Sequence, residues 1–220
     1  MKFENLCIKC MNEKESPDQL CPYCGFDPFS YRPAPHHLPT YTVLHRRYLL
    51  GIVLGEGGFG ITYIGMDMGL QIPVAIKEYY PNGTAFREKS GSYLVYTGDA
   101  DWEEFQKGRE RFLEEARTLA KFQGLPGIVE VKDFFEENDT AYIVMEYLPG
   151  ITLKKYLKKR GRLSVEETLS MMLPLIDALK EVHKKGVIHR DISPDNIMLM
   201  KDGRRKLLDF GGAREMSPDG

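Results

Sequence analysis

Apolar residues in the middle of the chain fall in short runs that polar and glycine-rich turns separate. Residues 48–56, 61–67 and 71–80 are rich in β-branched and aromatic side chains, so each run predicts a strand. Residues 128–135 and 140–147 predict two more strands, with the polar turn ENDT between them. The pattern favours a β-rich region built from consecutive hairpins.

Two other segments carry apolar residues at three- and four-residue spacing, which predicts amphipathic helices. The first covers residues 103–122. The second covers residues 164–186, where Ser164 and Glu167 form a capping box and Gly186 ends the helix. The apolar face of the first helix consists of Phe105, Phe112, Leu113, Ala116, Leu119 and Ala120.

All four cysteines lie near the N-terminus, at Cys7, Cys10, Cys21 and Cys24. Two C-x2-C turns bring four soft thiolates to one point, which predicts a tetrahedral structural zinc site. Two disulfides or four unrelated thiols are the alternatives. The first residues, MKFENLCIKC, contain no apolar signal-peptide region, so we expect a cytoplasmic, reducing location that disfavours disulfides. Gly25 supplies the positive φ that such turns usually need.

Residues 28–45 are rich in proline and almost without apolar periodicity, which predicts an extended, semi-rigid connector. This connector is expected to separate a zinc-ribbon-like module, residues 1–27, from the rest of the chain. Removal of the metal would then unfold the module alone. His36 and His37 are expected to be solvated side chains of the connector rather than zinc ligands.

Composition narrows the class of protein. Hydrophobic residues make up 42% of the chain, and 30 Lys and Arg residues nearly balance 32 Asp and Glu residues, for a net charge of −2. This balance argues against a polybasic nucleic-acid-binding surface and against an acidic disordered chain. No apolar run approaches the roughly 18 residues that a membrane span needs. We therefore expect a globular protein with no nucleic-acid partner and no membrane segment in this chain.

The sequence GEGGFG at residues 55–60 links the first two predicted strands. Gly55, Gly57 and Gly60 leave room for phosphate oxygens to approach backbone N–H groups, and Phe59 at the tip would close over the ligand. A strand rather than a helix follows, so the turn does not match a dinucleotide-binding βαβ unit. An ordinary flexible hairpin is the alternative.

Three more motifs follow in order: V-A-I-K at residues 74–77, H-R-D at residues 189–191 and D-F-G at residues 209–211. With these motifs, residues 46–214 resemble a protein kinase. The resemblance is greatest to bacterial serine/threonine-kinase-like proteins, some of which carry an N-terminal zinc ribbon.

The resemblance implies an α+β, protein-kinase-like bilobal fold preceded by a small zinc ribbon. After the zinc-ribbon-like module (residues 1–27) and the proline-rich linker (residues 28–45), the β-rich N-lobe would cover residues 46–148. A partial helical C-lobe would cover residues 149–220.

The family's chemistry is ATP- and Mg²⁺-dependent transfer of a phosphoryl group to a protein Ser/Thr hydroxyl. The resemblance implies that Asp191 accepts the hydroxyl proton, and that Asn196 and Asp209 bind Mg²⁺, with Mn²⁺ as an alternative. It also implies that Lys77, paired with Glu115, holds the α- and β-phosphates of ATP.

The same resemblance implies where the nucleotide binds. The backbone of the glycine-rich turn would cover the phosphates, and Met145 would guard the back of the adenine pocket. Residues 146–148 would offer backbone groups to the adenine edge, while apolar side chains sandwich the ring. The implied ATP-binding residues are Leu54, Gly55, Glu56, Gly57, Gly58, Phe59, Gly60, Ala75, Lys77, Glu115, Met145, Glu146, Leu148 and Leu199.

Three features depart from the family pattern. Thr62 replaces the usual valine after the glycine-rich turn, and its similar shape should preserve adenine binding. Ser193 stands where serine/threonine kinases usually carry a lysine that helps to neutralise the γ-phosphate. Arg214 is a candidate replacement. The chain also stops soon after D-F-G, before the activation segment, so we expect a fragment with little or no transfer activity of its own. A nucleotide-binding pseudokinase scaffold and a zinc-ribbon adaptor are the alternative functions.

Overall fold

The computed structural model describes residues 2–87, 91–96 and 98–215. The chain divides into two compact units. The first consists of Met1–Leu113 and Lys132–Tyr147, and the second consists of Glu114–Val131 and Leu148–Gly220. None of the helices among the described residues is long and apolar enough to cross a bilayer.

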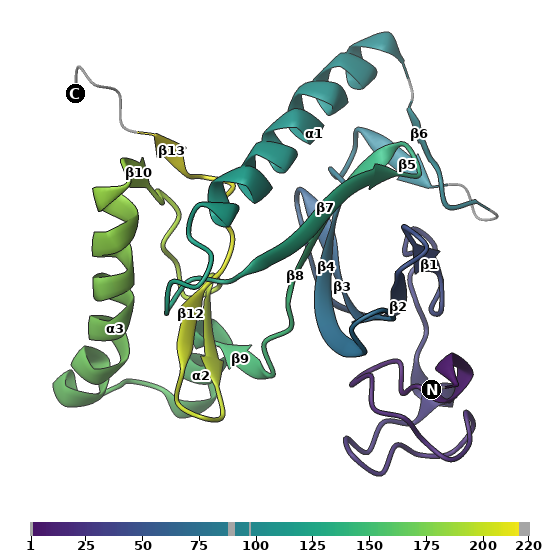
Figure 1. Cartoon of the computed structure of the whole chain (residues 1–220), viewed down its shortest axis with the longest axis horizontal. Coiled ribbons are helices and arrows are strands. Elements are labelled where there is room, and N and C mark those ends of the chain that lie inside the picture. The colour runs from purple at the N-terminus through teal and green to yellow at the C-terminus, as the bar shows by residue number, and fades with distance from the viewer. Residues whose placement is uncertain (1, 88–90, 97, 216–220) are drawn as a thin grey trace. The chain divides into compact units, whose positions relative to one another are not determined.

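A six-stranded sheet forms the centre of the first unit, in the order β1-β2-β3-β4-β8-β7 (Figure 1). Its longest strands, β2, β3 and β4, are successive antiparallel neighbours, and β8 pairs antiparallel with β4. The strand bounds are β1 Val43–Leu44, β2 Tyr48–Gly57, β3 Gly60–Asp67, β4 Ile72–Tyr79, β7 Val131–Glu137 and β8 Thr140–Glu146. The hairpins expected from the hydrophobic pattern are therefore present.

The sequence pattern predicted no structure for the segment after β4. The segment contains a separate two-stranded sheet, formed by β5 (Ala85–Arg87) and β6 (Leu94–Tyr96). Helix α1 follows as Asp99–Ala120, close to the predicted bounds. Within the first unit, Phe105 and Phe112 of α1 pack against the ring of Tyr79 at the end of β4.

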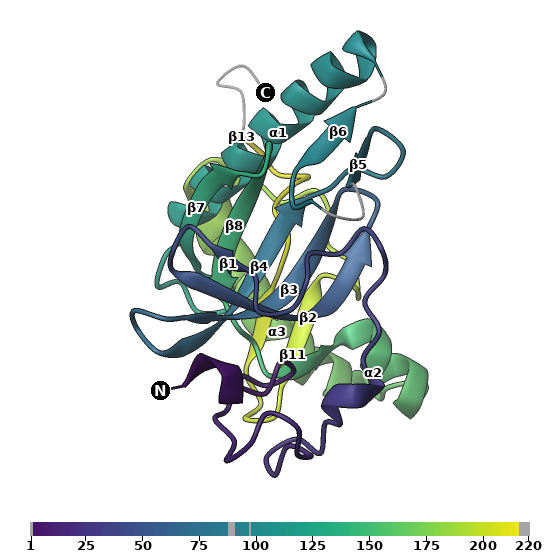
Figure 2. The ribbon, with the colours of Figure 1, turned by 90° about the vertical axis from the view of Figure 1, so that its right-hand side faces the viewer.

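The four-cysteine module lies beside β2 (Figures 1 and 2), and its apolar side chains complete the core of the sheet. Leu6 and Met11 form one buried cluster with Leu49, Ile64 and Met66 of β2 and β3. Each such side chain, fully buried, contributes about 1.5–3 kcal/mol. The module and the sheet thus share a hydrophobic core, which sequence analysis did not anticipate.

Backbone contacts fix the same arrangement. The carbonyl of Ile8 accepts the N–H of Ile52 in β2 at 2.8 Å, and Tyr41 donates its hydroxyl to the carbonyl of Leu6 at 3.0 Å. A Cβ added at Gly51 would collide with Ile8 O and Met11 Cε, so the close approach of the module requires glycine at this position.

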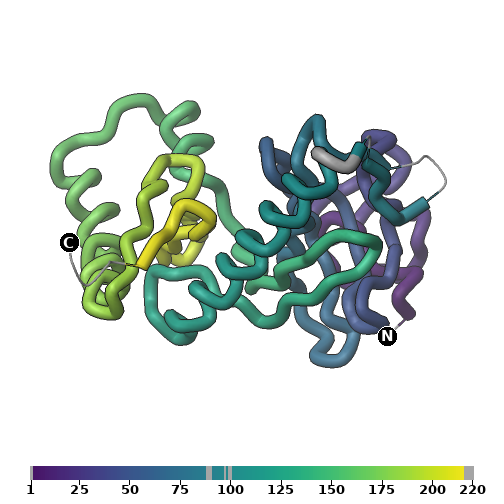
Figure 3. The backbone as a smooth tube through the Cα atoms, turned by 90° about the horizontal axis from the view of Figure 1, so that it is seen from above, coloured from purple at the N-terminus to yellow at the C-terminus, as the bar shows by residue number. Residues whose placement is uncertain are grey.

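The second unit contains helices α2 (Leu153–Arg160) and α3 (Val165–Lys184), and α3 lies beside β12 (Figure 3). The predicted capping box is present: Ser164 Oγ accepts the N–H of Glu167, whose carboxylate accepts the N–H of Ser164. Gly186, with φ of 76°, follows the helix end. The strands are β9 Gly150–Thr152, β10 Val187–Ile188, β11 Ile197–Met200, β12 Arg205–Leu207 and β13 Arg214–Glu215.

Candidate functional site

The structure brings the four cysteines together. Their sulfur atoms all lie within 4.8 Å of one another, and both the Cys7–Cys24 and Cys10–Cys21 pairs have Sγ–Sγ distances of 3.6 Å. Sulfurs at the corners of a tetrahedron about 2.3 Å from zinc would be about 3.8 Å apart. The donor set and its spacing therefore fit a four-coordinate zinc ion.

Each C-x2-C pair forms a turn of the same design. The N–H of Met11 bonds to Cys7 O, the N–H of Gly25 bonds to Cys21 O, and both distances are 2.8 Å. Met11 and Gly25 have φ of 58° and 66°, so Gly25 adopts the positive φ expected from the sequence.

The environment of Cys21 favours its thiolate. Burial raises the pKa of the Cys21 thiol, but hydrogen bonds from the backbone N–H groups of Cys24 and Tyr23, among other contacts, outweigh this effect and lower the pKa to about 7. Burial raises the pKa of the Cys7 and Cys24 thiols. A thiolate is the form that binds zinc.

The glycine-rich turn links β2 and β3, with Gly57 and Gly60 as paired residues at its base. The side chain of Phe59 at its tip is 77% exposed. Backbone carbonyls of the turn bind the segment after β4: Tyr80 donates its N–H to Phe59 O and Asn82 donates its N–H to Gly58 O, both at 3.1 Å. The segment after β4 therefore holds the tip of the turn through two backbone hydrogen bonds.

The glycines of this turn differ in the space that a Cβ atom would find. A Cβ at Gly60 would collide with the carbonyl of Glu78 in β4, whereas a Cβ at Gly57 would meet nothing within 4 Å. We expect Gly60→Ala to destabilise the first unit by about 1–3 kcal/mol, as overpacking does. Gly57→Ala should change the stability by less than about 1 kcal/mol. Urea unfolding of the two variants measures the difference, and equal effects would contradict the steric argument.

Several of the implied ATP-binding residues lie in register on neighbouring strands of the first unit. Ala75 of β4 faces Met145 of β8, and Lys77 of β4 faces Ile143 of β8. The ammonium of Lys77 lies over the ring of Phe112, 5.5 Å from its centre. Leu54, near the end of β2, is 38% exposed.

The H-R-D segment of the second unit is built around a buried histidine. His189 is fully buried; its Nδ1 accepts the N–H of Asp191, and its Nε2 donates to Leu208 O, both at 3.2 Å. Burial lowers the pKa of His189, so its imidazole is neutral near pH 7. Asn196 Nδ2 donates to Asp191 Oδ2 at 2.8 Å and to Asp191 O at 3.0 Å. Asp191, which the resemblance assigns to proton transfer, is thus hydrogen-bonded to Asn196, which the resemblance assigns to Mg²⁺ binding.

The D-F-G turn packs directly against this segment. The rings of Phe210 and His189 have centres 4.4 Å apart, and a Cβ at Gly212 would lie 3.2 Å from the Cβ of Asp191. Asp209 has φ of 44°, and its Oδ1 accepts the N–H of Gly211 at 3.0 Å.

Glu115 lies at the same turn. Its side chain is buried, and its Oε2 is 3.3 Å from the position that a Cβ on Gly211 would take. Of the remaining implied ATP-binding residues, Leu148 is 8% exposed and Leu199 lies in β11, opposite Ile151 and Arg205. Lys77 and Glu115 belong to different units.

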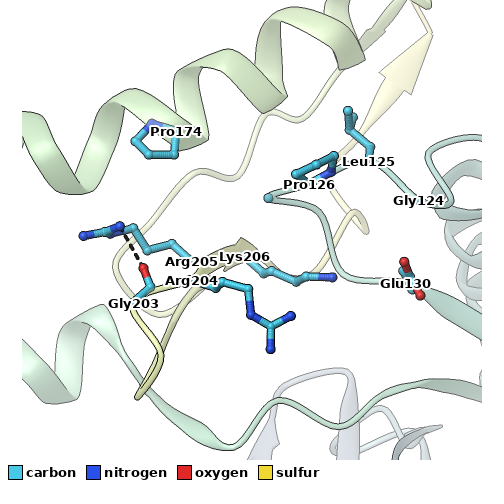
Figure 4. Close-up of a pocket in the computed structure, with 10 residues that line it drawn as sticks. Gly124, Leu125, Pro126, Glu130, Pro174, Gly203, Arg204, Arg205 and Lys206 are labelled. Atoms are coloured by element: carbon cyan, nitrogen blue, oxygen red, sulfur yellow. Dashed lines mark hydrogen bonds between the residues drawn. The ribbon is translucent and has the colours of Figure 1, made fainter.

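A separate cavity of about 460 Å³ lies in the second unit (Figure 4). Residues 124–127, Glu130, Pro174 and residues 203–206 line it. Asp191, Asn196 and Asp209 are not among them, so this cavity is distinct from the residues that the motifs identify.

The first unit also contains a side-chain cluster that the sequence did not predict. His36 Nε2 and His37 Nε2 contact the two carboxylate oxygens of Glu56 in the glycine-rich turn, at 2.9 and 3.1 Å. The side chain of His37 is only 11% exposed, so the expectation that both histidines are solvated is wrong. The hydrogen bond from His37, with a further one from His36, lowers the pKa of Glu56. Local sequence carries no signal for this contact, because it depends on how the linker folds back.

A glycine-rich hairpin in an antiparallel sheet, followed by packed H-R-D and D-F-G segments, defines a protein kinase. The sequence profile of the protein kinase domain matches residues 48–220, and the chain belongs to this family. Its kinase fold, with a β-rich N-lobe, agrees with the fold that sequence analysis expected.

The curated relatives include bacterial serine/threonine-protein kinases. The chain is 36% identical over 178 residues to the probable serine/threonine-protein kinase SCO3848 of Streptomyces coelicolor, covering 79% of this chain and 24% of the relative. It is 34% identical over 171 residues to the serine/threonine-protein kinase PrkC of Bacillus subtilis, covering 78% of this chain and 23% of the relative. The chain thus spans about a quarter of the length of these relatives.

A solved structure described as the PpkA-294 apo form has a TM-score of 0.75 and 36% sequence identity to the chain. The match covers 80% of this chain and 62% of that one.

Proposed function

We propose that this chain is the nucleotide-binding part of a protein kinase that transfers the γ-phosphoryl group of Mg·ATP to a Ser or Thr hydroxyl of a protein. The observation that carries the proposal is the hydrogen-bonded frame of the second unit, in which Asn196 binds Asp191 and the D-F-G turn packs on His189. Phosphoryl transfer depends mainly on positioning and on charge neutralisation. This frame positions the amide of Asn196 and the carboxylates of Asp191 and Asp209, which suits both tasks.

Each polar residue then has a distinct role. Asp209 and Asn196 would bind Mg²⁺ through hard oxygen ligands. Asp191 would accept the proton of the attacking hydroxyl. Lys77 would hold the α- and β-phosphates as a fixed positive charge, with Glu115 as its partner, and the backbone of residues 55–60 would cover them.

Four thiolates would bind one structural Zn²⁺ at Cys7, Cys10, Cys21 and Cys24. Their spacing and the turns around them support this assignment. Zinc has no redox chemistry, so its contribution is to the folding of the module. A reducing cytoplasmic location would keep the four thiols available.

A nucleotide-binding scaffold without transfer is the second candidate, and Ser193 is the residue that favours it. Ser193 is half-buried, and its carbonyl accepts the N–H of Asn196 at 3.0 Å. Its hydroxyl is uncharged, so the side chain brings no cation to this loop. The Arg214 guanidinium donates to the carbonyl of Ala213 at 2.6 Å. Lys154 forms an ion pair with Asp195 at 2.7 Å.

Transfer of labelled γ-phosphate to a mixture of Ser/Thr peptides by the complete protein tests the proposal, with Lys77→Met as the matched control. Loss of a charge-assisted contact of about 1.5–3 kcal/mol should weaken Mg·ATP binding by roughly tenfold to a hundredfold. Binding of Mg·ATP without transfer would instead support the scaffold. Absence of binding would contradict both functions.

A further inference from the structure

The glycine-rich turn contains one carboxylate, and the linker between the four-cysteine module and the sheet holds it. Glu56 Oε1 contacts His36 Nε2 at 2.9 Å, and Glu56 Oε2 contacts His37 Nε2 at 3.1 Å. The side chains of Glu56 and His36 are each 33% exposed, and that of His37 is 11% exposed. Two adjacent linker residues therefore occupy both oxygens of one side chain of the turn.

The tautomer of His37 identifies its contact with Glu56 as a hydrogen bond. Its Nδ1 accepts the backbone N–H of Ala34 at 3.1 Å, so the ring proton of the neutral imidazole is on Nε2 and points to Glu56. The three side chains also have their donor atoms within 4.8 Å of one another, as a metal site would. A metal on Nε2 would move the proton of the neutral imidazole to Nδ1, where it would face the N–H of Ala34. The geometry thus favours a hydrogen-bonded latch over a metal site.

The linker is itself anchored at this point. Leu38 is 1% exposed, and its N–H donates to the hydroxyl of Tyr63 in β3 at 3.1 Å. The guanidinium of Arg87 in β5 donates to the carbonyl of His36 at 2.5 Å. Arg87 is held in turn by a buried ion pair with Glu78 of β4. Residues 36–38 therefore have a fixed position on the sheet from which to hold the turn.

The same cluster reaches the tip of the turn. The rings of His36 and Tyr80 stack with their centres 5.5 Å apart, and the N–H of Tyr80 donates to Phe59 O at 3.1 Å. The turn is therefore held at Glu56 by the histidine side chains and at Phe59 by the backbone N–H of Tyr80. His36 contacts both Glu56 and the ring of Tyr80.

We propose that His36 and His37 are positioning residues for nucleotide binding, which hold the glycine-rich turn in place through Glu56. The proposal rests on the proposed function for its consequence, since the turn is the element expected to cover the phosphates. A glycine-rich segment loses much conformational entropy when it closes on a ligand. A turn that is already ordered loses less, so the latch raises affinity for the nucleotide.

A double-mutant cycle tests the latch in the complete protein. The variants are the pair His36→Ala with His37→Ala, the single change Glu56→Ala, and all three changes together. Amide hydrogen exchange of residues 55–60 without nucleotide reports on the turn, and titration with Mg·ATP reports on binding. We expect faster exchange and about three- to tenfold weaker binding in the histidine variant, as for the loss of partly exposed hydrogen bonds. Glu56→Ala should give a similar result, and the triple variant should add little.

Two further variants separate positioning from simple destabilisation. Gln at positions 36 and 37 keeps a side-chain N–H donor, so His36→Gln with His37→Gln should restore much of the affinity and slow the exchange. His183→Ala, an exposed histidine on α3, is the matched control and should change neither quantity. In the kinetic assay the effect should fall on the KM for ATP more than on kcat.

The outcomes distinguish the two proposals. Unchanged exchange of residues 55–60 in the histidine variant would overturn the latch, whether or not nucleotide binds. Tighter nucleotide binding in that variant would also overturn it, because the contact would then oppose binding. Faster exchange in a protein that does not bind Mg·ATP at all would support the latch and contradict the proposed function.

Discussion

Replacing Asp209 with Asn in the complete protein is expected to weaken Mg·ATP binding and to abolish phosphoryl transfer. The carboxylate is the principal metal ligand in the proposed mechanism, and a neutral amide cannot balance the charge of the cation. Removal of one electrostatic contact at the transition state commonly costs about 10²–10³ in rate. Calorimetric titration with Mg·ATP and a phosphoryl-transfer assay measure the two effects.

The fold should tolerate this substitution. Asp209 has φ of 44°, a conformation that Asn adopts more readily than most residues, and an amide oxygen can still accept the N–H of Gly211. A loss of function in Asp209→Asn would therefore report on the metal site rather than on misfolding. An unchanged thermal midpoint is the control.

Asp191→Asn is the matched comparison. Its Oδ2 accepts a hydrogen bond from Asn196 at 2.8 Å, and the amide oxygen of the variant can do the same. In the proposed mechanism Asp191 acts on the acceptor hydroxyl, so nucleotide binding should stay near normal while the rate falls by about 10²–10⁴. Equal loss of nucleotide binding in both variants would contradict the separate roles.

Removing the zinc proposed for the four-cysteine module, or replacing Cys10 with Ser, is expected to destabilise the whole first unit. Leu6 and Met11 lie in one buried cluster with Leu49, Ile64 and Met66 of the sheet. If the module unfolds, the burial of both module side chains is lost, at about 1.5–3 kcal/mol each. The free energy of unfolding of the sheet should therefore fall by roughly 3 kcal/mol or more.

Trp102, the single tryptophan of the chain, offers a probe at a distance from the cysteines along the sequence. It lies on α1, and the centre of its ring is 4.9 Å from that of Tyr96, so its fluorescence reports on the unfolding of the first unit. Urea unfolding is compared with and without a chelator. The exposed Glu15→Ala change is the control for substitution within the module, and Cys10→Ser should show no further response to chelator. An unchanged Trp102 transition would mean that the module folds independently.

Gly51→Ala separates docking from metal binding. The added Cβ would meet Ile8 O and Met11 Cε, both of which belong to the module. This variant should bind as much zinc as the unmodified protein in metal analysis. Its free energy of unfolding, measured by Trp102 fluorescence, should still fall. Loss of the metal together with the stability would mean that the docked position is needed to form the site.

The motifs identified in the sequence could be predicted because each depends on residues close together in the chain. The two C-x2-C turns need only neighbouring residues to point their sulfurs inward, and the Ser164–Glu167 box is complete within one helical turn. The order of strands β2, β3 and β4 follows from short hairpins, which leave little choice of partner.

Other features depend on contacts between residues far apart in the sequence. The β5–β6 hairpin escaped notice because its strands have three residues each, too few for periodicity. The buried ion pair of Glu78 and Arg87 also escaped, because an isolated charged residue is usually solvated and only its surroundings reveal its burial.

The sequence by itself therefore determined the family, the motif residues and the four-cysteine cluster, since each depends on residue type and spacing over short distances. Only the tertiary structure decided how the N-terminal segment is used. A proline-rich composition indicates stiffness but not direction, so it could not reveal that the linker returns to the sheet. The burial of Leu6, Met11 and Leu38, and the contacts of His36 and His37 with Glu56, arise because that return brings distant apolar and polar groups together.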